Sequence, residues 1–157
     1  MAAAQSAADE VKAALSKLQR IIGVRRNYES EIDKPVVFIT HMEHHSNHTS
    51  WLETIAKVVT IPACPQGLIC LDSFKELLEQ YKDYTLKIAS VTGCSNVTGI
   101  KTPYHEVAKL MHQNSGVCFV DFACSGPYVA IDMHPPAPDA YLDAIFFSPH
   151  KFLGGPG

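Results

Sequence analysis

Four polar stretches follow apolar runs in this sequence, and they carry side chains that could take part in chemistry. The first is "HMEHHSN" at 41–47, after "VVFIT", and the second is "GCSN" at 93–96, after "LKIASVT". The third is Asp121, near the end of "GVCFVDF", and the last is "SPHK" at 148–151, after "AIFF". Together they supply an imidazole, an amide, a carboxylate and an amine.

One cofactor needs all four groups at once. Pyridoxal phosphate requires a lysine amine for its aldehyde, a carboxylate that keeps its pyridine nitrogen protonated, a group over its ring face, and donors for its phosphate. Any one of these residues is more often a turn, cap or surface residue. Their joint presence predicts a site for pyridoxal phosphate, with Lys151 supplying the amine.

The elements between these stretches alternate, which indicates an α/β fold. Strands are predicted at 36–40, 57–61, 86–92, 116–122 and 144–148, and helices at 47–56, 72–82 and 103–114. Apolar strands separated by such helices favour a mostly parallel sheet with helices on both faces. Ligands bind such sheets at the carboxyl ends of the strands, where the four polar stretches would lie.

Helix boundaries are predicted from capping residues. Asp72 is expected to cap the helix at 72–82. Thr102 is expected to cap the helix at 103–114, with Pro103 at its first position and Gly116 just past its end. The helix at 72–82 is expected to bury Phe74, Leu77, Leu78 and Tyr81.

The chain divides into two parts. Residues 1–34 are expected to form an amphipathic helix at 9–22 and a polar connection, and residues 35–157 the α/β domain. The formal charge is −3, and the absence of a basic cluster argues against a nucleic-acid partner. No apolar run approaches the roughly 20 residues that span a bilayer, and no secretory signal is recognisable. The sequence therefore predicts a soluble cytoplasmic protein without a membrane partner.

The five cysteines lie at positions 64, 70, 94, 118 and 124 and include no Cys-x-x-Cys pair. An odd number of cysteines favours reduced thiols over a disulfide framework. Each is expected to be a small buried apolar residue.

Four motifs carry a family resemblance in their order and spacing: "THMEHHSNHTSW", "VTGCSNVTGI", "CFVDFACSGPYVAID" and "DAIFFSPHKFLGGPG". Over about residues 35–157 the sequence resembles the class V aminotransferase family, which includes the cysteine desulfurases and selenocysteine lyases. The resemblance implies part of the large domain of a fold-type I pyridoxal-phosphate enzyme. It also implies an amino acid substrate, cysteine desulfurase-like chemistry and a homodimer in the full-length form.

The resemblance implies a role for each candidate residue. Lys151 would be the Schiff-base lysine and would move the proton at the substrate α-carbon, while His44 would stack on the cofactor ring. Asp121 would pair with the pyridine nitrogen, and Asn96 would contact the phenolic oxygen. The phosphate would be held by Ser148 and His150.

The sequence departs from the family pattern at three places. Cys124 stands where the family usually has Gln or His, three residues after the aspartate. The family's glycine-rich phosphate loop has no counterpart before Gly23, and the chain stops six residues after Lys151. We therefore expect a fragment, with the substrate-binding arginine and the small domain outside it.

Two other hypotheses remain open. The four histidines at 41, 44, 45 and 48 have helical spacing and could bind a metal, although Ser46 or Asn47 is expected to cap the helix that follows, so that they would straddle a turn. The chain could also be a catalytically inactive α/β domain kept for association.

Overall fold

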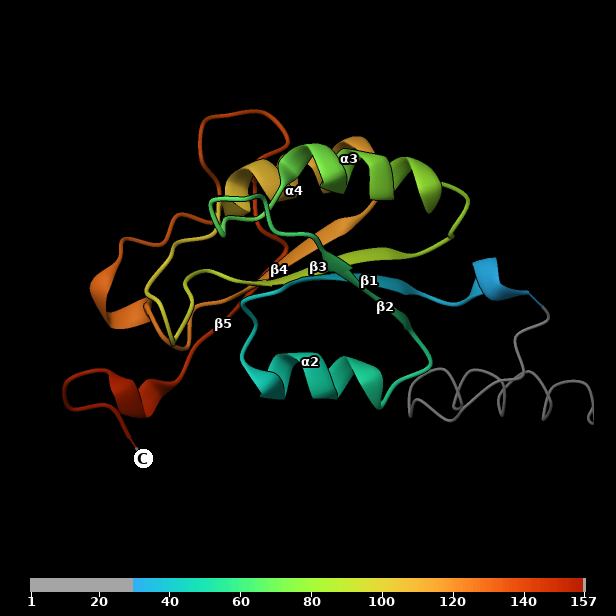
Figure 1. Cartoon of the computed structure of the whole chain (residues 1–157). Coiled ribbons are helices and arrows are strands. Elements are labelled where there is room, and N and C mark those ends of the chain that lie inside the picture. Colours follow the sequence, from blue (N-terminus) through green and yellow to red (C-terminus); the bar gives the residue numbers. More distant parts are fainter. Residues whose placement is uncertain (1–29, 157) are drawn as a thin grey trace, which may run out of the picture.

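The computed structural model describes residues 30–156, which form a five-stranded parallel sheet flanked by helices (Figure 1). The strand order is β2-β1-β3-β4-β5, and every neighbouring pair is parallel. The strands are β1 (Val36–Thr40), β2 (Lys57–Ile61), β3 (Lys87–Thr92), β4 (Val117–Asp121) and β5 (Ala144–Phe146). The predicted α/β fold with a parallel sheet is confirmed. The helix expected at 9–22 lies outside the described residues.

Helices cover both faces of this sheet, as the sequence predicted. The α-helices are α2 (His45–Leu52), α3 (Leu71–Gln80) and α4 (Tyr104–Gln113). Three short 3-10 turns are η1 (Glu31–Asp33), η2 (Gly126–Tyr128) and η3 (Pro149–Lys151). In Figure 1, α3 and α4 lie on one face and α2 lies on the other. The chain leaves β1 toward β2 and later leaves β3 toward β4, so the order of the strands reverses between β1 and β3.

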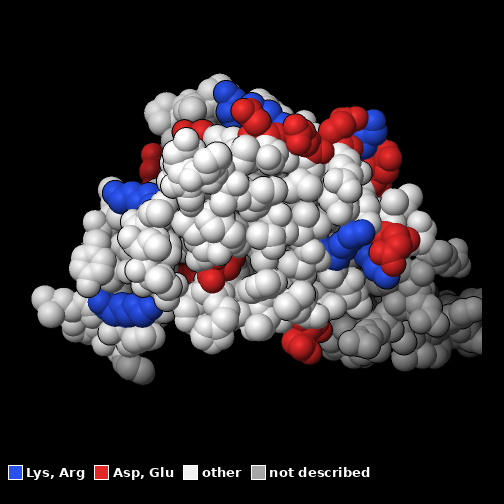
Figure 2. Space-filling view, in the orientation of Figure 1, with Lys and Arg blue, Asp and Glu red and all other residues white. Residues whose placement is uncertain are grey.

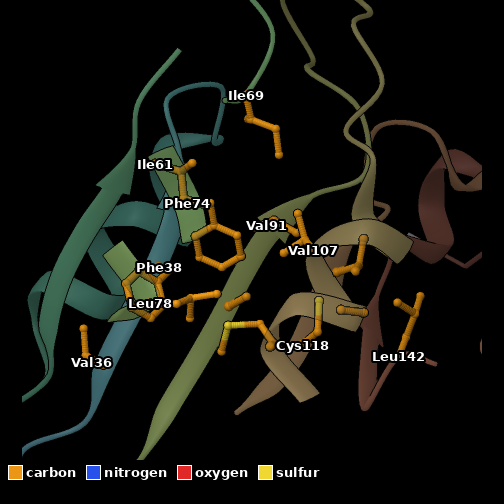
Figure 3. Packing of buried hydrophobic residues seen from close by; sticks show 14 of the residues in the cluster. Val36, Phe38, Ile61, Ile69, Phe74, Leu78, Val91, Val107, Cys118 and Leu142 are labelled. Carbon is orange, nitrogen blue, oxygen red and sulfur yellow. The ribbon is translucent and has the colours of Figure 1, made fainter. Parts of the chain in front are cut away.

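The core lies mainly between the sheet and the pair α3 and α4. All residues of β1 and β3 are buried, as central parallel strands require, whereas β2 and β5 are edge strands and partly exposed. Figure 3 shows Phe38 of β1 beside Phe74 and Leu78 of α3, and Val91 of β3 beside Val107 of α4. A smaller cluster around Val37 and Ile39 faces α2.

The caps predicted for three helices are wrong, and in α2 and α3 the cap is decided by a side chain that accepts a nearby N–H group. Cys70 caps α3 in place of Asp72, since the Cys70 sulfur accepts the Ser73 N–H. The α4 helix begins at Tyr104 with Pro103 in the cap position, and Thr102 makes no capping bond. The α2 helix spans residues 45–52 and not 47–56, and its cap is described with the site below.

Gly116 lies just past the end of α4, as predicted, but for a different reason. The residue with left-handed backbone is Ser115, at φ 57°, and the Gly116 N–H donates to the Met111 carbonyl at 2.8 Å. A Cβ on Gly116 would clash with the Met111 side chain and crowd the Lys87 carbonyl oxygen. Gly116 therefore permits close packing of α4 against β3.

The face seen in Figure 2 is uncharged over most of its area, and acidic and basic side chains are interspersed along its upper rim. Over residues 30–156, no helix combines the length and apolar character that crossing a bilayer requires. All five cysteines are free thiols; Cys94 and Cys118 are buried, and the other three are partly exposed.

Candidate functional site

A cavity of about 130 Å³, here called the strand-end cavity, lies at the carboxyl edge of the sheet. It is lined by residues at or just after the ends of β1, β3, β4 and β5, the four strand ends singled out in the sequence. The lining residues are His44, Ser46, Thr92, Cys94, Asn96, Asp121, Ala123, Cys124, Ser148 and Lys151. Five of the six candidate site residues are thus brought together.

A second cavity of about 400 Å³ adjoins the first and shares Ser46, Asp121, Ala123 and Ser148 with it. Its remaining lining includes Trp51 from α2 and two exposed aromatic residues, Phe146 and Phe147. The two cavities together reach the volume of a typical small-molecule site, which is about 300–1,000 Å³. The strand-end cavity is thus lined mainly by polar residues, and the second cavity adds three aromatic residues.

His44 is placed by the start of α2. Its Nδ1 atom accepts the Ser46 N–H at 3.2 Å, so the His44 imidazole caps the helix. The predicted cap, Ser46 or Asn47, is therefore wrong. The Ser46 hydroxyl lies 2.7 Å from the same nitrogen, and the His45 ring packs against the His44 ring at a centroid distance of 4.2 Å. These contacts orient an exposed imidazole at the rim of the cavity.

Asn96 belongs to a tight loop after β3. The Ser95 hydroxyl accepts the N–H groups of Val97 and Thr98, and the Ser95 N–H donates to the Ile100 carbonyl at 2.9 Å. The loop is closed by an isolated bridge between Cys94 and Lys101. The backbone thereby presents the Asn96 amide, which is exposed, to the strand-end cavity.

Asp121 is the last residue of β4 and lines both cavities. Its Oδ1 atom accepts the Ala123 N–H at 2.8 Å, which fixes the carboxylate within its own turn. In the sheet, Asp121 lies beside Thr92 of β3 and Phe146 of β5. The carboxylate is therefore held between two strands at the floor of the site.

Lys151 is exposed at the end of η3 and reaches the strand-end cavity from the β5 side. Its loop is tight, because the Phe152 N–H donates to the Pro149 carbonyl and the Gly155 N–H donates to the Phe152 carbonyl. A Cβ on Gly155 would clash with the carbonyl oxygen of Pro149. The glycine-rich run after Lys151 thus allows a close turn there.

His150 is the one candidate that does not line the strand-end cavity, although it is adjacent to Lys151 in η3. The metal hypothesis is not supported either. His41 precedes α2 and contacts the Gly67 carbonyl at 3.0 Å, so the four histidines do not share one helix face. Within residues 30–156, no group of three or more His, Cys, Asp or Glu side chains is placed to hold a metal ion.

Two features of the site were not assigned a role from the sequence. The Glu43 carboxylate accepts four hydrogen bonds beside the cavity, although nothing in its sequence position indicates those partners. Cys94 and Cys124 both line the cavity, and burial, followed by the neighbouring Cys124 thiol, raises the pKa of Cys94. The contacts of Glu43 with Thr92 and of Cys94 with Cys124 join residues far apart in the chain, so no local sequence pattern indicates them.

The family model for aminotransferase class-V matches residues 5–157 of this sequence. The chain belongs to the aminotransferase class-V family. Among curated class-V relatives, a cysteine desulfurase from Synechococcus elongatus is 35% identical over 125 residues, covering 77% of this chain and 19% of the relative. A probable cysteine desulfurase from Halalkalibacterium halodurans is 30% identical, covering 77% of this chain and 29% of the relative.

Solved structures agree with this class-V fold. The NifS-like protein from Rickettsia africae superposes with a TM-score of 0.64 at 26% identity, covering 82% of this chain and 33% of that protein. The cysteine desulfurase CsdA from Escherichia coli gives a TM-score of 0.63 at 27% identity, covering 76% and 29%. The chain therefore spans about a third or less of the length of these relatives.

The residues of the cavity fit the cofactor that the class-V family generally uses, pyridoxal phosphate. An amine, a carboxylate, an imidazole, an amide and a hydroxyl face one space from four strand ends. This donor set offers a partner to the aldehyde, the pyridine nitrogen, the ring face, the phenolic oxygen and the phosphate.

Proposed function

We propose that this chain forms the pyridoxal-phosphate-binding core of an enzyme that acts on an amino acid with cysteine desulfurase-like chemistry. One observation carries the proposal: a lysine, an aspartate, a histidine, an asparagine and a serine from four strand ends line a single cavity. Family membership adds independent support.

Each residue has a distinct task in this proposal. Bound pyridoxal phosphate would draw electrons away from the α-carbon of an amino acid. The Lys151 amine would hold the cofactor aldehyde and, once the substrate amino group has displaced it there, would be free to move the proton at the α-carbon. The Asp121 carboxylate favours a protonated pyridine nitrogen, since an opposite charge stabilises a cation. His44 covers the ring face.

The remaining residues orient the cofactor. The Asn96 amide would donate to the phenolic oxygen, and the Ser148 hydroxyl would donate to the phosphate. His150 lies beside Ser148 on an exposed turn and would supply a second donor to the phosphate only from outside the cavity lining. We expect Ser148 to contribute more than His150 to phosphate binding.

The proposed substrate is an amino acid, and L-cysteine is the first to test because two of the similar proteins named above are cysteine desulfurases. The sequence has arginine at positions 20, 25 and 26, all outside the described residues. Residues 30–156 therefore include no arginine that could bind the substrate carboxylate. We also propose that the complete enzyme is a homodimer.

The test is covalent labelling of the lysine. The purified chain is mixed with pyridoxal phosphate, reduced with borohydride, digested and mapped by mass spectrometry. We expect the pyridoxyl label on the peptide that contains Lys151. The Lys151→Ala variant should lose the label and the absorbance band of the covalent adduct, and should keep its fold because Lys151 is exposed.

Lys101→Ala is the matched control, because Lys101 is another exposed loop lysine close to the site. It should label at Lys151 as the wild-type protein does. Label distributed evenly over Lys57, Lys101 and Lys151 would refute the assignment. Sulfide release from L-cysteine, followed in parallel, tests the substrate separately from cofactor binding.

A further inference from the structure

The strands β1 and β3 separate before they reach the site. Their ladder pairs only Val36–Phe38 with Lys87–Ala89. Beyond this point each strand stays paired with its outer neighbour, since Thr40 still lies opposite Ile61 of β2 and Thr92 opposite Asp121 of β4. The carboxyl edge of the sheet therefore opens into two halves between β1 and β3.

The Glu43 side chain lies in this opening and joins the two halves. Its Oε1 atom accepts the Thr92 N–H at 2.8 Å, the Thr40 N–H at 3.1 Å and the Thr40 hydroxyl at 2.7 Å. Its Oε2 atom accepts the Asn47 Nδ2 amide at 2.8 Å. One carboxylate thus replaces the backbone hydrogen bonds that β1 and β3 no longer make.

Asn47 extends the connection to α2. Its Nδ2 group also donates to the Ser90 carbonyl at 3.1 Å, and its Oδ1 atom accepts the Ser90 hydroxyl at 2.9 Å and the Trp51 indole N–H at 3.2 Å. Every group that faces the Glu43 carboxylate is a donor. Burial raises the pKa of Glu43, and hydrogen bonds from Thr40, Asn47 and Thr92 act against that increase.

The two halves carry different parts of the site. Glu43 immediately precedes His44, and Thr92 leads into the loop of Asn96, where the Thr92 hydroxyl donates to the Cys94 carbonyl at 2.8 Å. We propose that Glu43 is a positioning residue that sets the distance between His44 and Asn96 across the opening. The expected effect of Glu43 on cofactor affinity rests on the proposed function, whereas the hydrogen bonds of Glu43 do not.

Glu43→Gln tests the role with little change of shape. A glutamine has one acceptor oxygen, so its NH₂ group must face donors, either the Asn47 amide or the N–H groups of Thr40 and Thr92. The matched control is Asp143→Asn, another acid-to-amide change. Asp143 accepts the Cys118 N–H at 2.7 Å near the start of β4, away from the cavity.

The experiment measures two quantities on the whole chain. Amide hydrogen exchange of Thr92 in the cofactor-free protein should accelerate about tenfold in Glu43→Gln, since in either orientation the amide replaces the charged acceptor of the Thr92 N–H by a neutral oxygen or by a donor. The dissociation constant of pyridoxal phosphate should rise by a similar factor. Asp143→Asn should change neither, whatever its melting temperature. Thr40→Val, which removes one of the four donors, should shift both quantities in the same direction by less.

The outcomes distinguish a failure of the proposed cofactor binding from a failure of the positioning role of Glu43. Wild-type protein that binds no pyridoxal phosphate would refute the proposed function, while the exchange of Thr92 would still test Glu43. Faster exchange with unchanged cofactor affinity would show that Glu43 only stabilises the sheet and would overturn its positioning role. An equal loss of affinity in Asp143→Asn would overturn it as well. If Glu43→Gln does not fold, Thr40→Val decides the question by the same two measurements.

Discussion

Asp121 is held by its own backbone turn, and this allows its charge to be changed without changing its position. The oxygen of an asparagine at 121 can still accept the Ala123 N–H. We expect Asp121→Asn to bind pyridoxal phosphate. The pKa of the pyridine nitrogen of the bound cofactor, followed by nitrogen NMR of isotope-labelled cofactor, should fall by about one to three pH units, because a neutral amide no longer favours the protonated pyridine nitrogen.

The control for this change is Asp132→Asn. Asp132 accepts the His134 N–H at 2.9 Å in a similar local turn and lies outside both cavities. The titration of the pyridine nitrogen in this variant should match that of the wild type. Identical midpoints in Asp121→Asn and the wild type would remove Asp121 from the cofactor site.

Two cysteines should differ widely in reactivity. Hydrogen bonds from the Ser73 hydroxyl and N–H lower the pKa of Cys70, whereas burial raises the pKa of Cys118 to about 12. A thiolate is the reactive form, and a lower pKa makes more of it at neutral pH. Iodoacetamide should therefore label Cys70 first, and Cys118 only after unfolding. Ser73→Ala should slow labelling of Cys70, as peptide mapping over a time course can show.

At the level of elements, the Lys151 turn can be tested through its glycines. A side chain at 155 would clash with the Pro149 carbonyl, so Gly155→Ala must open the turn. We expect loss of the borohydride-trapped label at Lys151, with a nearly unchanged melting temperature because the turn is exposed. Labelling by pyridoxal phosphate and thermal unfolding measure the two effects.

Gly154→Ala is the control for this turn. Gly154 has φ +74° but open space around its Cα, so alanine there adds backbone strain of about 1 kcal/mol without a clash. We expect this variant to keep most of the label. Equal labelling of Gly155→Ala and the wild type would show that the turn does not position Lys151.

At the level of the whole molecule, β5 is an edge strand with exposed aromatic residues. It pairs with β4 over only three positions, and Phe146 and Phe147 are 54% and 52% exposed. Unpaired edges and apolar patches favour association. We expect the sedimentation coefficient to rise with protein concentration. Phe147→Lys should reduce this rise, whereas Leu153→Lys, at an exposed position beyond the strand, should not. A constant value for the wild type would contradict the prediction.

Much of this fold could be predicted from the sequence because its signals are local. Apolar runs of five or six residues separated by amphipathic helices specify parallel strands, and polar residues directly after such runs specify the carboxyl edge. The candidates Asp121, Asn96 and His44 could be identified from this reasoning together with the family motifs. Their convergence on one cavity follows from the parallel sheet.

Tertiary structure decided what local patterns do not encode. Cys70 and the His44 imidazole cap helices because their donors happen to lie within reach, although Asp72 and Ser46 are the usual capping types. The separation of β1 from β3 depends on pairing between distant segments, and so does the place of Glu43 within it. Residue types and spacing determine which groups are available, whereas hydrogen-bond partners far apart in the chain determine how those groups are held.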